Sequence, residues 1–166
     1  MVYDGKEKEN GVMNRQQHGL ISFLMGCLAI IIGCAAIAQS SILLAILYLC
    51  IVAFCGLIIL YSYCCKCPCR LTSCAHLIPG KITTVLPRRM IGKYSLVDFI
   101  GFAVPMIIVI IFPQYWLVKK VPYLVAFWLL IIIAVADSYS VVCIGCENRY
   151  CPLREIELGI EEEKKE

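Results

Sequence analysis

Four long, almost uncharged stretches set the strongest limit on what this chain can fold into. Residues 20–38 and 42–63 contain no charged side chain, and two further apolar stretches follow between 95 and 142. A helix needs about 20 predominantly apolar residues to cross the hydrocarbon core of a bilayer. Two adjacent uncharged stretches make a buried hairpin of a soluble protein a poor alternative. We therefore predict four transmembrane helices.

The composition agrees with a membrane protein and excludes other classes. Of the 166 residues, 61% are hydrophobic and only 16% are charged. Soluble domains contain roughly 45–50% apolar and about 25% charged residues, so this chain has too little polar material to cover a soluble surface. The net charge of +3 comes without a basic patch interleaved with aromatics, which argues against a nucleic-acid partner. The expected partners are the lipid bilayer and other membrane-protein subunits or a second copy.

The order of these stretches predicts an all-α integral membrane protein, a four-transmembrane-helix bundle built from two hairpins. The segments that we expect are an N-terminal tail (1–19), hairpin one (20–63), a cysteine-rich basic loop (64–94), hairpin two (95–142), and a cysteine-rich segment with an acidic tail (143–166).

The basic residues predict the orientation. Of the 15 Lys and Arg, only Lys119 and Lys120 lie at a short turn between two spans. Cytoplasmic loops carry an excess of Lys and Arg, so both termini and the central loop are expected in the cytoplasm. The polar first 19 residues do not resemble a cleaved signal peptide. We therefore expect a protein of the plasma membrane with both ends inside.

The two hairpins align without a gap at an offset of 79 residues, which suggests a tandem repeat. This offset places Cys64 and Cys67 on Cys143 and Cys146, and the turn at Ser40 on Lys119. A parallel repeat has a pseudo-twofold axis along the membrane normal and would bring the two C-x-x-C pairs face to face. The alternative is that any two membrane hairpins look alike.

The 12 cysteines fall into two groups. Four lie within the spans and are expected to pack as small residues, together with Gly26, Ala29, Gly33 and Ala36: Cys27, Cys34, Cys50 and Cys55. The other eight lie in segments expected at the cytoplasmic face. Cytosolic thiols are normally reduced, so a dense group of them favours metal binding over structural disulfides.

Four thiolates suffice for a tetrahedral zinc site or one iron–sulfur cluster, and the sequence leaves these two cofactors undecided. The preferred ligand set follows the repeat: Cys64, Cys67, Cys143 and Cys146. A second, weaker set contains Cys65, Cys69, Cys74 and Cys151, with His76 as a substitute ligand. Palmitoylation of cysteines next to the membrane is the alternative, and suits Cys64 and Cys65 best.

Two carboxylates lie inside the spans near the same face. Ionisable residues in membrane helices usually face the bundle interior or a wet cavity and often mark functional sites. Asp137 is therefore a candidate for binding a cofactor, as part of a proton path or a quinone-headgroup pocket, with a hydrogen bond between spans as the alternative. Asp98 is expected to cap its helix. His18 is expected to be an exposed interface residue.

Three functions are compatible with these features. The first is a redox or electron-transfer subunit, or an accessory subunit, of a larger membrane complex with a cysteine-ligated site at the cytoplasmic face. The second is a structural protein whose two hairpins are pinned by zinc. The third is a membrane thiol–disulfide oxidoreductase, which resembles the quinone-linked disulfide-forming enzymes and the vitamin K epoxide reductases in architecture only. Whether the chain is an enzyme stays open.

Overall fold

The structure, a computed structural model, describes residues 14–71, 74–143, 146, 148, 150 and 151. These residues form helices, turns and loops, and no strand occurs among them. The long helices are α1 (Arg15–Ala38), α2 (Ile42–Ser62), α4 (Leu96–Ile111) and α6 (Val121–Asp137). Short helices α3 (Leu77–Ile82) and α5 (Gln114–Leu117) complete the set, with 3-10 turns at Cys64–Lys66 and Pro68–Leu71 and a π-helical turn at Ser138–Cys143.

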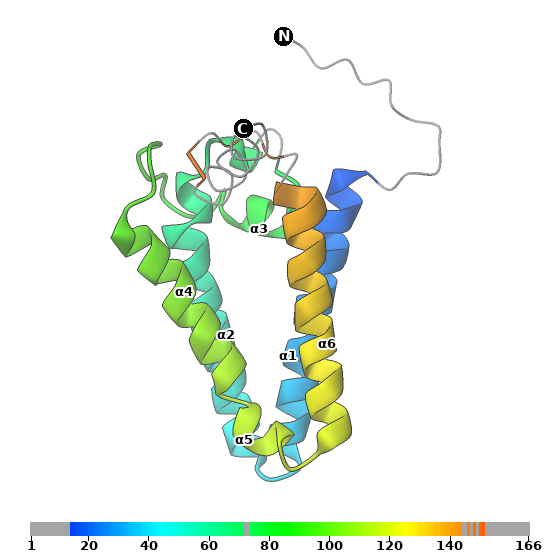
Figure 1. The fold of residues 1–166 in the computed structure, drawn as a ribbon. Coiled ribbons are helices and arrows are strands. Elements are labelled where there is room, and N and C mark those ends of the chain that lie inside the picture. Colours follow the sequence, from blue (N-terminus) through cyan, green and yellow to red (C-terminus); the bar gives the residue numbers. More distant parts are fainter. Residues whose placement is uncertain (1–13, 72–73, 144–145, 147, 149, 152–166) are drawn as a thin grey trace, which may run out of the picture.

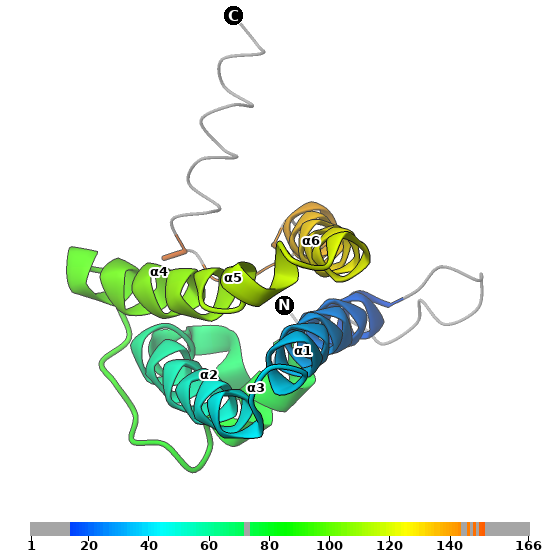
Figure 2. The same ribbon diagram turned by 90° about the horizontal axis from the view of Figure 1, so that it is seen from below.

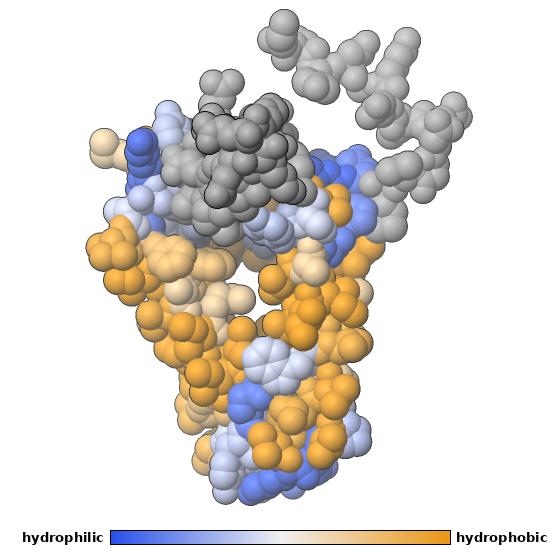
Figure 3. Space-filling view, in the orientation of Figure 1, coloured by the Kyte–Doolittle hydropathy of each residue, from blue (hydrophilic) through white to orange (hydrophobic). Residues whose placement is uncertain are grey.

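Four helices are long and apolar enough to cross a membrane, as the sequence predicts. With their continuing turns these spans cover Arg15–Ala38, Ile42–Lys66, Leu96–Leu117 and Val121–Cys143. An apolar surface runs along the helices, and polar side chains gather at both ends of the molecule (Figure 3). Because lipid is as apolar as these side chains, their exposure is expected for a protein in a bilayer.

The helix boundaries follow from local chemistry. Ser41 caps α2 by accepting a hydrogen bond from the Leu44 backbone N–H. Ser95 caps α4 and forms a reciprocal capping box with Asp98, so the predicted capping role of Asp98 is confirmed. Pro113 separates α4 from α5, and Pro122 lies in the first turn of α6, where a missing N–H costs nothing.

The closest helix pairs are formed between the hairpins, not within them. Helix α1 packs along α6, and α2 packs along α4 (Figures 1 and 2). Helix α1 also contacts α2, through Ile37, Ala45 and Tyr48 near the turn that joins them. Of the predicted bundle of two hairpins, the four long helices are therefore confirmed, whereas the closest packing joins helices of different hairpins.

The two pairs converge at the end that holds the short turns and diverge at the other end, where α3 lies (Figure 1). We call the latter the loop end. It carries the first turn of α1, the cysteine-rich loop after α2 and the end of α6. The two predicted cysteine segments thus lie at one end of the bundle.

Small residues on α1 explain why it packs on the α5–α6 side. Ala29 and Ala36 are buried in one cluster with Leu117 and Phe127. A Cβ added at Gly33 would lie 3.2 Å from the Cβ of Pro113, so this glycine also permits close approach. Gly26 does not belong to this group, contrary to the sequence analysis, because a Cβ there would meet no atom within 4 Å.

Gly19 makes the closest approach between α1 and the loop. A Cβ at this position would overlap the backbone carbonyl oxygen of Ala75. Alanine at 19 must therefore displace α1 from the loop, with an expected cost of about 1–3 kcal/mol in unfolding free energy, as for overpacking elsewhere.

Thermal unfolding in detergent of Gly19→Ala and of Gly26→Ala tests this contact. Gly26→Ala adds the same methyl group to the same helix in open space, and should be neutral or stabilise by about 0.5–1 kcal/mol. Equal melting temperatures for the two variants would contradict the contact between Gly19 and Ala75.

Candidate metal site and carboxylate clusters at the loop end

The two cysteine segments touch each other at the loop end. The Asn148 side-chain amide donates to the Cys67 Sγ at 3.6 Å, and the Tyr63 hydroxyl lies 3.1 Å from the Cys151 Sγ. Tyr63 and Cys67 follow α2, whereas Asn148 and Cys151 follow α6. The loop after α2 and the segment after α6 are therefore in direct contact.

Five thiols form one group of electrostatic neighbours. Cys64 is an electrostatic neighbour of Cys67 and Cys74, and of Cys65 at the edge of the group. Both Cys67 and Cys74 are neighbours of Cys146. Cys69 adjoins Cys67 and Cys74 as well. We call these five residues the thiol group. It combines four cysteines of the loop with one from the segment after α6.

Two thiols of this group outside the spans, Cys67 and Cys74, resist ionisation. The pKa of Cys67 is raised to about 12, chiefly by burial; the backbone N–H of Cys69 opposes the shift, and the thiols of Cys69, Cys146 and Cys74 add to it. Burial also raises the pKa of Cys74, while its backbone hydrogen bond with His76 and the charge of Arg15 oppose this. Neutral, crowded thiols need a cation before they can become thiolates.

The preferred ligand set of the sequence analysis is brought together in part. Cys64, Cys67 and Cys146 lie in the thiol group, and so do Cys69 and Cys74 from the second set. Cys143 adjoins the Tyr63 hydroxyl, which also contacts Cys151.

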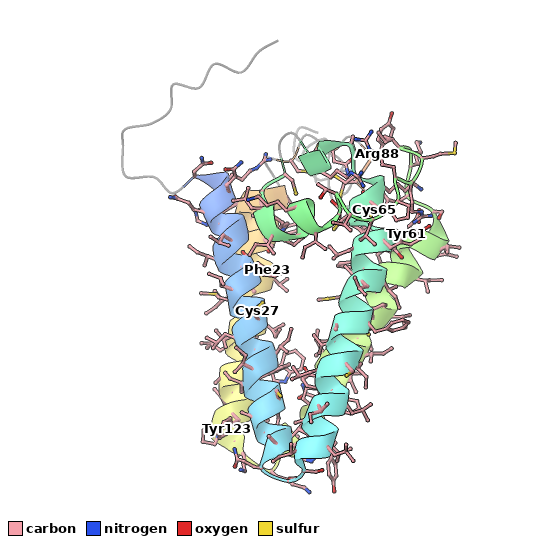
Figure 4. The ribbon with its side chains drawn as sticks, turned by 180° about the vertical axis from the view of Figure 1, so that it is seen from behind. Phe23, Cys27, Tyr61, Cys65, Arg88 and Tyr123 are labelled. Carbon is pink, nitrogen blue, oxygen red and sulfur yellow. The ribbon has the colours of Figure 1, made fainter. Side chains whose placement is uncertain are left out.

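The other candidates of the second set lie elsewhere. Cys65 is buried beside the Arg70 guanidinium. Figure 4 labels Cys65 and Arg88, which both lie at the loop end. The Nδ1 of His76 lies 3.2 Å from the Gly19 carbonyl oxygen, so this ring joins the loop to α1. Burial lowers the pKa of His76, which keeps the imidazole neutral at physiological pH.

Within the part of the chain that the structure describes, no three His, Cys, Asp or Glu side chains form a group that could hold a metal ion as they stand. The donor chemistry of the thiol group nevertheless fits a soft metal, because zinc and iron–sulfur clusters are held by four thiolates. A metal removes the repulsion between neighbouring thiolates and favours their ionised form.

Asp98 anchors the loop to α4. Its carboxylate is fully buried and accepts from the Lys66 Nζ at 2.7 Å and from the Arg89 Nη1 at 2.6 Å. The Ser95 backbone N–H and hydroxyl donate to the same carboxylate at 2.9 Å. Lys66 stands between Cys65 and Cys67, so this ion pair fixes the start of the cysteine-rich loop.

Asp137 joins α6 to α1. One carboxylate oxygen lies 2.7 Å from the His18 Nδ1, and the other accepts from the Ser22 hydroxyl at 2.6 Å. An ionised carboxylate can only accept, so its short contact with His18 requires a proton on Nδ1. Ser22 contacts the carboxylate instead of the imidazole, so these three residues are not arranged as a nucleophile with its base. The arrangement favours the predicted hydrogen bond between spans over cofactor binding by Asp137.

His18 is the residue whose role the sequence analysis missed. It was expected to be exposed, but its side chain is 23% exposed and paired with Asp137. One signal was available, because His18 and Ser22 lie four residues apart and therefore on one face of a helix. Their common partner, 115 or more residues away, carries no mark in the sequence.

Replacing Asp98 tests the anchor of the loop. Asp98→Asn keeps the shape but leaves Lys66 and Arg89, which are 12% and 30% exposed, without their counter-charge. Breaking a buried pair costs roughly 3–5 kcal/mol, and partial exposure of Arg89 places the expected loss at the lower end. Thermal unfolding in detergent measures it. Arg88→Gln removes one charge from the same loop and is the control; a loss no larger than the control's would refute the anchor.

Replacing Asp137 tests the link between α1 and α6. Hydrogen bonds to charged groups contribute about 1.5–3 kcal/mol, so Asp137→Asn should destabilise more than Ser22→Ala, which removes a single donor and should cost about 1 kcal/mol. Bound metal, measured by elemental analysis, should be unchanged in both variants because neither residue belongs to the thiol group. Loss of metal in Asp137→Asn would show that this carboxylate serves the metal site.

Comparison of the chain with protein-family models, with curated proteins and with solved structures finds no match. The inference of function therefore depends on the geometry of the loop end.

Proposed function

We propose that this membrane protein binds a thiophilic metal through Cys64, Cys67, Cys74 and Cys146, and that the metal fastens its two helix pairs to each other at the loop end. In this proposal the ligand set differs from the one based on the repeat by exchanging Cys143 for Cys74. The loop end faces the cytoplasm, where thiols stay reduced and available to metal.

The observation that carries the proposal is the mixed origin of the thiol group. Cys64, Cys67 and Cys74 belong to the loop that continues α2, whereas Cys146 follows α6. Cys146 is an electrostatic neighbour of both Cys67 and Cys74. Helix α2 pairs with α4 and helix α6 pairs with α1, so a metal bound by these four residues would link one pair to the other.

The surroundings of the thiol group suit thiolate ligands. Arg15 stabilises the ionised form of Cys74, and the Asn148 amide donates to the sulfur of Cys67. Such contacts around the ligands orient them and tune their basicity. Four cysteines without an open position are typical of structural zinc, so zinc is the metal that we favour.

A redox or electron-transfer subunit of a larger complex is the other candidate, with an iron–sulfur cluster on the same four cysteines. The same thiolates suit either cofactor. Colour separates the two, because a cluster absorbs visible light and zinc does not.

The deciding experiment is purification of the full chain in detergent under anaerobic conditions, followed by elemental analysis and an absorbance spectrum. We expect colourless protein with one zinc per chain. Cys67→Ser and Cys146→Ser should each lose that same zinc. Cys50→Ser, which removes an exposed thiol in the middle of α2, should retain it.

Comparison of Cys74→Ser with Cys143→Ser tests the choice of ligands. Loss of zinc in Cys74→Ser alone would support the set proposed from the structure, whereas loss in Cys143→Ser alone would support the set based on the repeat. Brown protein containing iron and sulfide would favour the electron-transfer function. Metal-free protein with reducible cysteine pairs would overturn metal binding and favour thiol–disulfide exchange.

A further inference from the structure

A small pocket at the loop end lies beside the thiol group, and its wall combines cationic and hydrogen-bonding side chains with Cys74, Leu77 and Gly80. Its volume is about 170 Å³, and it is bounded by Gln16 of α1, by Arg70 of the loop, and by Lys81 and Thr84 at the end of α3. This volume equals roughly that of five or six water molecules at about 30 Å³ each, which suits a small group such as a phosphate.

The charges around the pocket are of one sign. Arg70 and Lys81 line it, and Arg15, in the first turn of α1, adjoins Cys74, which also lines it. No carboxylate is among the described residues that form the wall. In the described part of the chain, the carboxylates of Asp98 and Asp137 contact Lys66, Arg89 and His18, and neither Arg70 nor Lys81 pairs with them.

Arg70 carries a second, independent sign of a missing partner. Its Nη1 is buried, and no described residue forms a hydrogen bond with it. The same guanidinium contacts the Cys65 thiol, so its position is held from one side. A buried donor without a partner is unfavourable, more so when it is charged, and an oxyanion that reaches it would satisfy it. Arginine matches the planar geometry of phosphate oxygens especially well.

The surface next to the pocket is apolar. Leu77, Ile78 and Ile82 of α3 are each more than a third exposed, and Val85 just beyond is 89% exposed. A phospholipid presents this combination, with its phosphate at the headgroup level and its acyl chains below. Basic pockets between membrane helices on the cytoplasmic side bind the headgroups of anionic lipids.

We propose that this pocket binds a phosphate oxyanion through Arg70 and Lys81, with Gln16 and Thr84 as neutral donors, and that an anionic phospholipid supplies it. The alternative source of the same chemistry is a free phosphate or a soluble phosphate monoester. The proposal does not depend on the metal site, because no ligand exchange at the thiols is needed for the anion to enter.

The test titrates the full-length protein, purified in neutral detergent with the metal that it retains, with phosphatidylglycerol or phosphatidylcholine of the same acyl chains. Native mass spectrometry counts the bound lipids. We expect the first phosphatidylglycerol to bind at least tenfold more tightly than phosphatidylcholine. Lys81→Gln should weaken it about fivefold, since one basic side chain near a membrane surface contributes that much.

Arg88→Gln is the matched control, because it removes a positive charge from the same loop outside the pocket. It should leave phosphatidylglycerol binding within twofold of the original protein. If Lys81→Gln and Arg88→Gln weaken phosphatidylglycerol binding equally, diffuse surface charge explains the binding and the site is refuted. Equal affinity for the two lipids, without competition by phosphate, would refute it as well. Arg70→Gln should weaken binding further. If this variant does not fold, Lys81→Gln still decides the question, because the Lys81 side chain is exposed and its replacement should leave the fold intact.

A second arm identifies the source of the phosphate. Inorganic phosphate and glycerol 3-phosphate are added as competitors of phosphatidylglycerol. If the competitors displace phosphatidylglycerol only at concentrations more than about tenfold above that of the lipid, the phospholipid is the source of the phosphate. Strong binding of inorganic phosphate alone that is lost in Lys81→Gln keeps the phosphate site and assigns it to a soluble anion.

Discussion

The absence of water from the hydrocarbon core is the constraint on which the rest of this structure depends. Every backbone polar group inside a bilayer must find its hydrogen bond within the protein, so long apolar stretches can cross only as helices. Polar chemistry is then confined to the two ends. Both ion pairs of Asp98 and the His18–Asp137 hydrogen bond lie at the loop end, at the start of α1 and α4 or the end of α2 and α6. The same end carries the thiol group.

Each helix pair has its own carboxylate link. Asp98 of α4 binds Lys66 just after α2, and Asp137 of α6 binds His18 and Ser22 of α1. The offset of 79 residues that aligns the cysteines would place these carboxylates on Gly19 and Ile58, which carry no charge. The two links therefore do not repeat each other. A tandem repeat, which stays a prediction, would concern the helices and the cysteines alone.

The sequence was sufficient to predict the four spans, the capping by Asp98 and the position of both cysteine segments at one end, because hydropathy and capping act locally. It did not predict which helices pair. In lipid, helix pairing depends on the fit of side chains such as Ala29 and Phe127, and hydropathy carries no information about that fit. It also did not predict the role of His18, because its partner Asp137 is far away in the chain. That Gly26 faces open space could not be predicted either, because this depends on how distant helices pack.

The described hydrogen bonds that join the two pairs at the loop end are few and weak. The Tyr63–Cys151, Asn148–Cys67, Asn148–Tyr94 and His76–Gly19 contacts join uncharged groups, and such hydrogen bonds contribute only about 1 kcal/mol each. Structural zinc in small domains is bound with an apparent 10–16 kcal/mol, several times the sum of these contacts. A metal on Cys64, Cys67, Cys74 and Cys146 would therefore determine how far apart the pairs stand. Without it, the pairs would be connected by the convergence at the short turns, by these hydrogen bonds and by the contact of α1 with the loop at Gly19 and Ala75.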